Sequence, residues 1–222
     1  MDTKPKFGLF VPAAEVLIET RCLPHWYQPG VATFVTFRTA DSMPREKVEI
    51  WTRELRVWLA EHDIVLEPSE PLPSVTSLPK SLADRYRKQR DSRWQQHLDN
   101  CYGECVLRRR PIANIVLESL QHFDGSRYDL DSVIIMPNHV HVLCGFRAPT
   151  KCREQAASWL HYTAHEINRV LGRKGEFWQS EPFDHLVRSE SQFEHIRRYI
   201  RQNGVNARLP PTDYLYWSRD SK

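Results

Sequence analysis

The sequence lacks the features that mark membrane, secreted and disulfide-bonded proteins. No apolar run in the 222 residues approaches the roughly 18 residues of a membrane-spanning helix. The stretch from Met1 to Phe7 lacks the basic, apolar and small-residue zones of a signal peptide. The five cysteines follow no regular framework, which favours reduced thiols. These absences predict a soluble, cytoplasmic protein with no membrane partner.

A zinc site is also poorly supported. Cys101 and Cys105 could supply half of such a site, but no second Cys or His pair with ligand spacing lies nearby. We therefore interpret these two residues as ordinary buried or surface thiols.

The net charge of +3 is small and excludes no class of partner. Its distribution is more informative, because basic residues gather at 84–93, at 108–110, and at Arg197 and Arg198 with Arg201. Such clusters suit a phosphate backbone. A solvated helix face is the alternative interpretation of each cluster.

The first half of the chain predicts one strand followed by a helical insertion. Residues 31–38 are rich in β-branched and aromatic side chains and predict a strand. A helix with one apolar stripe is expected from Ser42 and Pro44 to about His62. A proline-rich arm at 67–80 and a charged helix at about 81–99 follow. We assign about 40–105 to an insertion that either adds a nucleic-acid surface or, as we favour, braces the core. No element is predicted for residues 1–30.

The second half alternates helices and strands. A helix is predicted from Pro111 to Asp124, strands at 132–136 and 138–146, a helix with Val170 on its apolar stripe and closed by Gly172, and a strand at 182–188. Pro137 and Asn138 form the turn between the two paired strands. This order predicts an α+β protein of one domain, with a ferredoxin-like (βαββαβ) antiparallel sheet and an added C-terminal helix.

Two histidines lie in the second strand of this hairpin. His139 and His141 are two residues apart and therefore share one face, with Val140 and Val142 on the other. Neutral imidazole nitrogens bind divalent ions at roughly 2.0–2.2 Å, which two neighbours on one strand can reach together. The pair therefore predicts half of a metal site, or else a polar face that meets solvent.

The final helix offers a second group of polar residues. Ser191 and Glu194 match a capping box, and Gly204 predicts the C-terminal stop. Phe193, Ile196 and Ile200 form a buried stripe, whereas His195, Tyr199 and Asn203 follow one another at intervals of four residues on an adjacent face. Tyr199 is either a partly buried tyrosine at the edge of the core or a nucleophile among basic residues.

Several ordered motifs resemble one known family. The run Met136-Pro-Asn-His-Val-His-Val-Leu143 resembles the His-hydrophobic-His signature of HUH single-tyrosine transposases, particularly the REP-associated tyrosine transposases of bacterial insertion sequences. Residues 177–188 resemble the family's segment leading into the tyrosine helix, and 198–209 resemble its ending. The similarity covers about 23–209.

The resemblance implies a role for each matched residue. His139 and His141 would be metal ligands, Tyr199 the catalytic nucleophile, and Asn203 the third ligand. His185 matches a recurrent family histidine. It joins Trp178, Arg197, Arg198 and Arg201 as a candidate for nucleic-acid contact.

The chain departs from the family in its ending. Asn203-Gly-Val-Asn-Ala-Arg208 replaces the family's Asn-Pro-Val-Lys-Ala-Gly, and the lysine often found after the hairpin is replaced near Leu160. These changes leave the catalytic set intact and bear on the details of DNA contact or on full activity.

The implied activity is cleavage and rejoining of single-stranded DNA at REP-like hairpins, through a 5′-phosphotyrosine and with Mg²⁺ or Mn²⁺ as cofactor. The implied location is the nucleoid. A monomer is favoured over a homodimer. A non-catalytic protein that binds single-stranded DNA or RNA, and a metal-dependent phosphoesterase, remain the alternatives.

Overall fold

The computed structural model describes residues 8–20 and 24–221. The chain divides into two compact units. The first consists of the residues up to Ala40 together with those from Cys105 onward, and the second is Asp41–Glu104. No helix in the described parts of the chain is both long and apolar enough to cross a bilayer.

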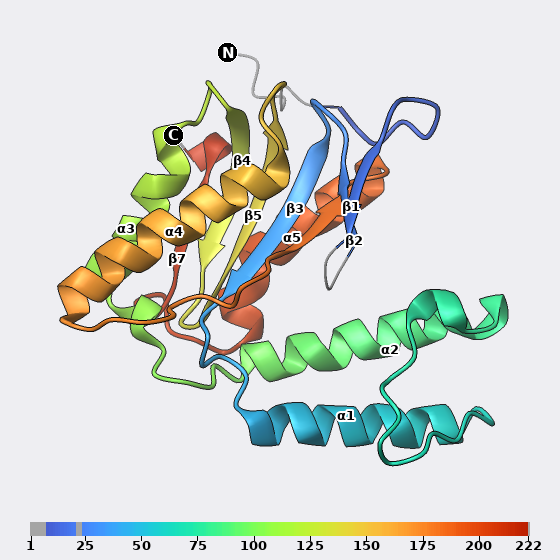
Figure 1. The fold of residues 1–222 in the computed structure, drawn as a ribbon. Helices are drawn as coiled ribbons and strands as arrows, with labels where there is room; N and C mark the ends of the chain where they lie inside the picture. Colours follow the sequence, from blue (N-terminus) through green and yellow to red (C-terminus); the bar gives the residue numbers. More distant parts are fainter. Residues whose placement is uncertain (1–7, 21–23, 222) are drawn as a thin grey trace. The chain divides into compact units, whose positions relative to one another are not determined.

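The first unit is built on a five-stranded antiparallel sheet (Figure 1). Its order is β6-β3-β5-β4-β7. The strands are β3 Ala32–Arg38, β4 Tyr128–Ile135, β5 His139–Phe146, β6 Phe183–Leu186 and β7 Leu215–Ser218. The first four have the order and connections of a ferredoxin-like sheet, so the predicted fold class is confirmed. The edge strand β7 follows the last helix and was not predicted.

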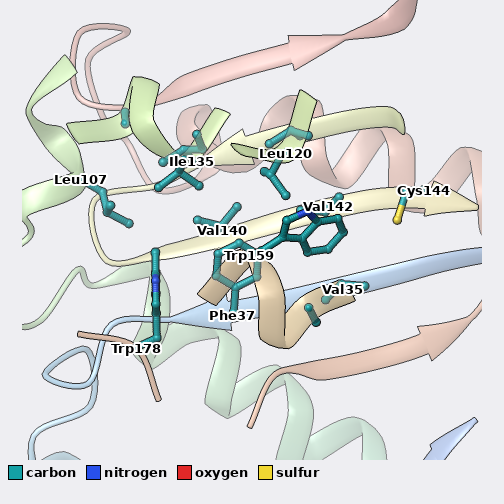
Figure 2. Packing of buried hydrophobic residues seen from close by; sticks show 14 of the residues in the cluster. Val35, Phe37, Leu107, Leu120, Ile135, Val140, Val142, Cys144, Trp159 and Trp178 are labelled. Atoms are coloured by element: carbon teal, nitrogen blue, oxygen red, sulfur yellow. The ribbon is translucent and has the colours of Figure 1, made fainter. Parts of the chain in front are cut away.

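Helices cover both faces of this sheet. α3 (Arg110–His122) and α4 (Cys152–Leu171) lie on one face, and α5 (Glu190–Asn206) lies on the other (Figure 1). Figure 2 shows Val140 and Val142 of β5 and Val35 of β3 among the buried residues beneath α3 and α4, with Trp159 of α4. This arrangement leaves the alternate residues of β5 directed toward α5.

The β4–β5 hairpin forms the centre of the sheet, and every residue of both strands is buried. Met136 N donates to His139 O across the turn at Pro137 and Asn138 (2.8 Å), as expected of a tight connection. Buried on both faces, β5 can carry polar side chains only where neighbouring elements accommodate them.

Two short strands, β1 (Leu17–Thr20) and β2 (Pro24–Tyr27), form a separate antiparallel pair. They lie in the region for which no element was predicted. Short 3₁₀ turns complete the unit at Val106–Arg108 (η2) and Arg219–Ser221 (η3).

The second unit, Asp41–Glu104, contains α1 (Arg45–Ala60), a 3₁₀ turn η1 (Val75–Ser77) and α2 (Lys80–Asp99). Leu55 and Leu59 of α1 pack with Leu78 and Tyr86 in a small core of its own. Both predicted helices of this region are present, and the proline-rich segment joins them.

Three details of the predicted helices were wrong. Ser189, not Ser191, caps α5, because its side chain accepts from Gln192 N (3.2 Å). The helix continues beyond Gly204, where a Cβ atom would overlap the ring of Tyr214, so this glycine permits close packing and does not stop the helix. Val170, placed on the buried stripe of α4, is 52% exposed.

Candidate functional site

The candidate site lies between β5 and α5, inside the first unit. β5 directs His139 and His141 toward α5, and their side chains are 0% and 1% exposed. The two rings are neighbours, with centroids 4.8 Å apart. Strand alternation, which predicted a shared face for the pair, is therefore confirmed.

His139 is oriented by the residue before it. Its Nδ1 donates to Asn138 Oδ1 (2.8 Å), since a carbonyl oxygen can only accept. The proton therefore sits on Nδ1, and Nε2 carries a lone pair. Nε2 is buried and has no hydrogen-bond partner. A histidine held in one tautomer by its other nitrogen is the usual preparation for metal binding.

His141 is held from both ends. Its Nδ1 lies 2.8 Å from Thr36 Oγ1 on β3, and its Nε2 lies 3.1 Å from the Tyr199 hydroxyl on α5. The ring also stacks on Phe34, with centroids 5.3 Å apart. Both neighbours are hydroxyls, which can donate or accept, and in the tautomer with the proton on Nδ1 the Nε2 atom accepts the hydrogen bond of Tyr199.

α5 supplies the two other predicted residues. Tyr199 is half-buried and Asn203 is 1% exposed, one helical turn further on. Asn203 Oδ1 is buried without a hydrogen-bond partner, like Nε2 of His139. An unpaired buried polar atom costs about 1–3 kcal/mol, so two of them at one place need a physical reason.

Burial keeps both imidazoles neutral. It lowers the pKa of His139 to about 3, and the positive charge of Arg38 adds to this effect. The nearby amide of Asn203 acts in the opposite direction and raises the pKa of His139. His139 Nε2 and Asn203 Oδ1 nevertheless make no hydrogen bond of ordinary geometry. Burial, with a smaller contribution from His139, also holds the pKa of His141 well below its usual value. Neutral imidazole is the form that binds metal ions.

The donor set fits a divalent ion. His139 Nε2 and Asn203 Oδ1 are the unpaired atoms, and His141 Nε2 is the third donor, occupied by a hydroxyl that an ion can displace. Within residues 8–20 and 24–221, no three side chains of His, Cys, Asp or Glu form a group that could hold a metal. A site here would consist of two imidazoles and one amide.

Two of the residues predicted to contact nucleic acid are engaged inside the protein. Trp178 is 4% exposed and its Nε1 donates to Thr163 Oγ1 (2.8 Å), so its ring belongs to the core and cannot stack on a base (Figure 2). Arg197 forms ion pairs with Asp131 and Asp220, which already use its guanidinium.

The remaining candidates lie on the surface or near it. Arg198 and Arg201 are exposed on α5 and stay candidates for phosphate contact. His185 is half-buried, and its Nε2 accepts from Gln192 Nε2 (2.7 Å), which ties β6 to the start of α5.

Sequence reasoning missed the residues that orient the histidines. Asn138 adjoins His139, so its role was open to prediction from its position. Thr36 and Arg38 lie opposite His141 and His139 on β3, and this pairing depends on the register of two strands separated by about a hundred residues.

Comparison with known proteins adds one finding. No protein-family model matches the chain, and neither does any curated protein. Among solved structures, a REP-associated tyrosine transposase bound to a REP hairpin is similar, at 12% identity over 92% of this chain and 93% of that one, with a TM-score of 0.40. A likeness of this size assigns neither a family nor an activity to the chain.

Proposed function

We propose that this protein is a metal-dependent tyrosine transposase, a single-strand DNA endonuclease and strand transferase that acts on REP-like hairpins through a 5′-phosphotyrosine. One observation carries the proposal. The fold brings His139, His141, Tyr199 and Asn203, distant in sequence, to one place between β5 and α5, with the Tyr199 hydroxyl 3.1 Å from His141 Nε2.

The two orphaned donor atoms support the metal requirement. His139 Nε2 and Asn203 Oδ1 are buried without partners, a costly arrangement that a bound ion relieves. His139, His141 and Asn203 would hold Mg²⁺ or Mn²⁺, which bind few protein ligands and leave positions for phosphate oxygens. When bound, the ion supplies Lewis-acid polarisation of the scissile phosphate.

The protein supplies the nucleophile. Tyr199 Oη attacks phosphorus, the bond between phosphorus and O3′ breaks, and the departing oxygen takes up a proton to become a free 3′-hydroxyl. The phenol, whose ordinary pKa is about 10, must lose its proton in this step. In the observed arrangement the hydroxyl lies 3.1 Å from His141 Nε2, but this nitrogen would hold the ion during the reaction, so it is not the base that takes up the proton. The covalent link preserves the phosphodiester energy, so another 3′-hydroxyl reverses the reaction without ATP.

The proposed partner is single-stranded hairpin DNA. Arg198 and Arg201 are exposed on the helix that carries Tyr199, so they can contact phosphates near the cleavage point. Arg38 adds positive charge beside His139, since burial lowers its pKa only to about 10 and leaves it charged at neutral pH. We place the protein at the nucleoid and favour a monomer.

The decisive experiment traps the intermediate. A REP-like hairpin with single-stranded flanks, labelled at either end, is incubated with the protein and Mn²⁺ and run on a denaturing gel. We expect a 3′ label to stay on the protein and a 5′ label to be released, because a 5′-phosphotyrosine retains the downstream strand. A chelator and the Tyr199→Phe variant should abolish the adduct.

The matched control is Tyr162→Phe, which removes an exposed hydroxyl from α4 on the opposite face of the sheet and should leave the adduct unchanged. Binding of DNA without an adduct in the wild-type protein would exclude the nuclease and leave a binding protein. Hydrolysis that survives Tyr199→Phe would instead favour a phosphoesterase.

A further inference from the structure

Arg197 connects α5 to two other segments of the first unit. Its Nε donates to Asp131 Oδ2 on β4 (3.1 Å), and its Nη2 pairs with Asp220 in η3. Nη1 also lies 3.6 Å from Glu194, one turn earlier on α5. The Arg197 side chain is 26% exposed and that of Asp131 only 4%. The guanidinium therefore bridges the helix, the sheet and the C-terminal turn.

Asp131 reaches Arg197 because of a β-bulge. Leu130 lies opposite Cys144 of β5, and Ser132 lies opposite the next residue, Leu143. No residue of β5 therefore lies opposite Asp131. The bulge also changes which residues of β4 face each side of the sheet. Leu130 and Val133, three residues apart, both belong to the core beneath α3 and α4. Such bulges redirect side chains, and here the redirected carboxylate meets α5.

Apart from Arg197, α5 makes polar contacts with the sheet through Gln192, which contacts His185 of β6, and Tyr199, which contacts His141 of β5. The remaining contact between α5 and the sheet is apolar. Phe193, Ile196 and Ile200 pack against Ile134 and neighbouring residues. Hydrophobic contact is non-directional, so it holds the helix on the sheet without fixing how far the helix turns or slides. A charged pair with a planar guanidinium has a defined geometry and can fix both.

The position of α5 matters for the site. Tyr199 follows Arg197 by two residues and Asn203 by six, all on one rigid helix. A rotation by one residue, about 100°, would carry both away from β5, and a misplacement of about 1 Å is enough to impair a catalytic group.

We propose that Asp131 and Arg197 are positioning residues, which set the rotation and axial position of α5 so that Tyr199 and Asn203 face His139 and His141. The catalytic meaning of this inference rests on the proposed function. The C-terminal turn takes part, since η3 holds Asp220 against Arg197 and is itself anchored by Arg219, which donates to Leu130 O (2.7 Å) and to Asp124 (2.6 Å).

The chain offers a matched control on the same strand. Asp129 is also a buried β4 carboxylate, and it accepts two hydrogen bonds from Arg147 (2.7 and 2.6 Å), a residue that follows β5 and lies outside α5. Asp131→Asn and Asp129→Asn each remove the charge of a carboxylate that is paired with a partly exposed arginine. Only the first should affect α5.

The first readout is amide hydrogen exchange, compared within each protein between α5 and the β4–β5 hairpin. We expect Asp131→Asn to speed exchange in α5 by about 10-fold relative to the hairpin, and Asp129→Asn to leave this ratio unchanged. Titration with Mn²⁺ alone should show about 10-fold weaker binding in Asp131→Asn only. Adduct formation should fall by about 10- to 100-fold, the cost of a catalytic group misplaced by about 1 Å.

Arg197→Lys provides a second variant if Asp131→Asn does not fold. It keeps the charge but loses the planar fork, so its exchange ratio should lie between those of the wild type and Asp131→Asn. Equal exchange ratios and equal Mn²⁺ affinities in the Asp131 and Asp129 variants would overturn the inference. A wild-type protein that forms no adduct would instead overturn the proposed function, and the exchange ratio would still decide the role of Asp131 and Arg197.

Discussion

His141 Nε2 is the atom at which two roles of the site compete. It lies 3.1 Å from the Tyr199 hydroxyl, and it is also one of the three atoms that we propose as metal ligands. A ring nitrogen has one lone pair, so it cannot accept the tyrosine hydrogen bond and bind an ion at the same time. An ion held at Nε2 would therefore displace the Tyr199 hydroxyl, which the proposed reaction requires to be free for its substrate.

This competition predicts that Tyr199→Phe binds Mn²⁺ more tightly than the wild type. A net hydrogen bond contributes about 0.5–1.5 kcal/mol, so the affinity should rise about 2- to 10-fold while the adduct is lost. Isothermal titration with Mn²⁺ in the absence of DNA measures the difference. Tyr162→Phe serves as the control, and equal or weaker binding by Tyr199→Phe would show that the hydroxyl does not compete.

A second prediction concerns Asn138, whose Oδ1 accepts from His139 Nδ1. Asn138→Ala should weaken Mn²⁺ binding about 10- to 100-fold, the usual effect of removing a residue that orients a ligating histidine. Asn138→Asp should strengthen it, because a carboxylate makes the imidazole more basic. Titration with Mn²⁺ tests both. Changes in the same direction for the two variants would point to general damage.

At the scale of elements, the start of α5 shows that two overlapping capping-box patterns can compete for one helix. Ser189 with Gln192 and Ser191 with Glu194 both match a capping box. The backbone decides between them. Ser189 is extended, with φ −151° and ψ 158°, and its hydroxyl accepts from Gln192 N, whereas Ser191 already lies inside the helix.

The structure therefore predicts different costs for two serines. Ser189→Ala should lower the free energy of unfolding by about 1 kcal/mol, because an N-cap hydrogen bond is lost. Ser191→Ala should change it by less than about 0.5 kcal/mol, as is usual for an exposed helical position. Urea denaturation of the two variants gives the comparison, and a larger loss for Ser191→Ala would contradict the assigned cap.

At the scale of the whole unit, stability depends on a core that is closed on both faces of the sheet. Tyr128 is fully buried there, donates to Leu120 O (2.8 Å) and accepts from Trp159 Nε1 (3.0 Å). Burial raises the pKa of Tyr128 to about 12, because the phenolate would be charged in an apolar interior.

This shift makes stability sensitive to alkaline pH. The unfolded chain loses the Tyr128 proton near pH 10 and the folded chain only near 12, so the stabilisation is complete below pH 10 and is lost as pH rises between these values. The loss from this residue should reach about 2 kcal/mol. Denaturation from pH 9 to 11.5 should show a steeper decline for the wild type than for Tyr128→Phe. Parallel curves would refute this assignment.

The sequence by itself determined the local features of this protein. Alternation placed His139 and His141 on one face of a strand, and helical periodicity placed Tyr199 and Asn203 one turn apart. The order of elements predicted the ferredoxin-like sheet. These patterns are readable because each depends only on the backbone geometry of a few neighbouring residues.

Only the tertiary structure decided which of these local features meet. It placed α5 over β5, assigned Arg197 to Asp131, buried Trp178 and added β7 to the edge of the sheet. None of these follows from a local pattern, because each depends on strand register and on packing between segments far apart in the chain. The same arginine or tryptophan is a surface residue or a buried one according to what the fold brings beside it.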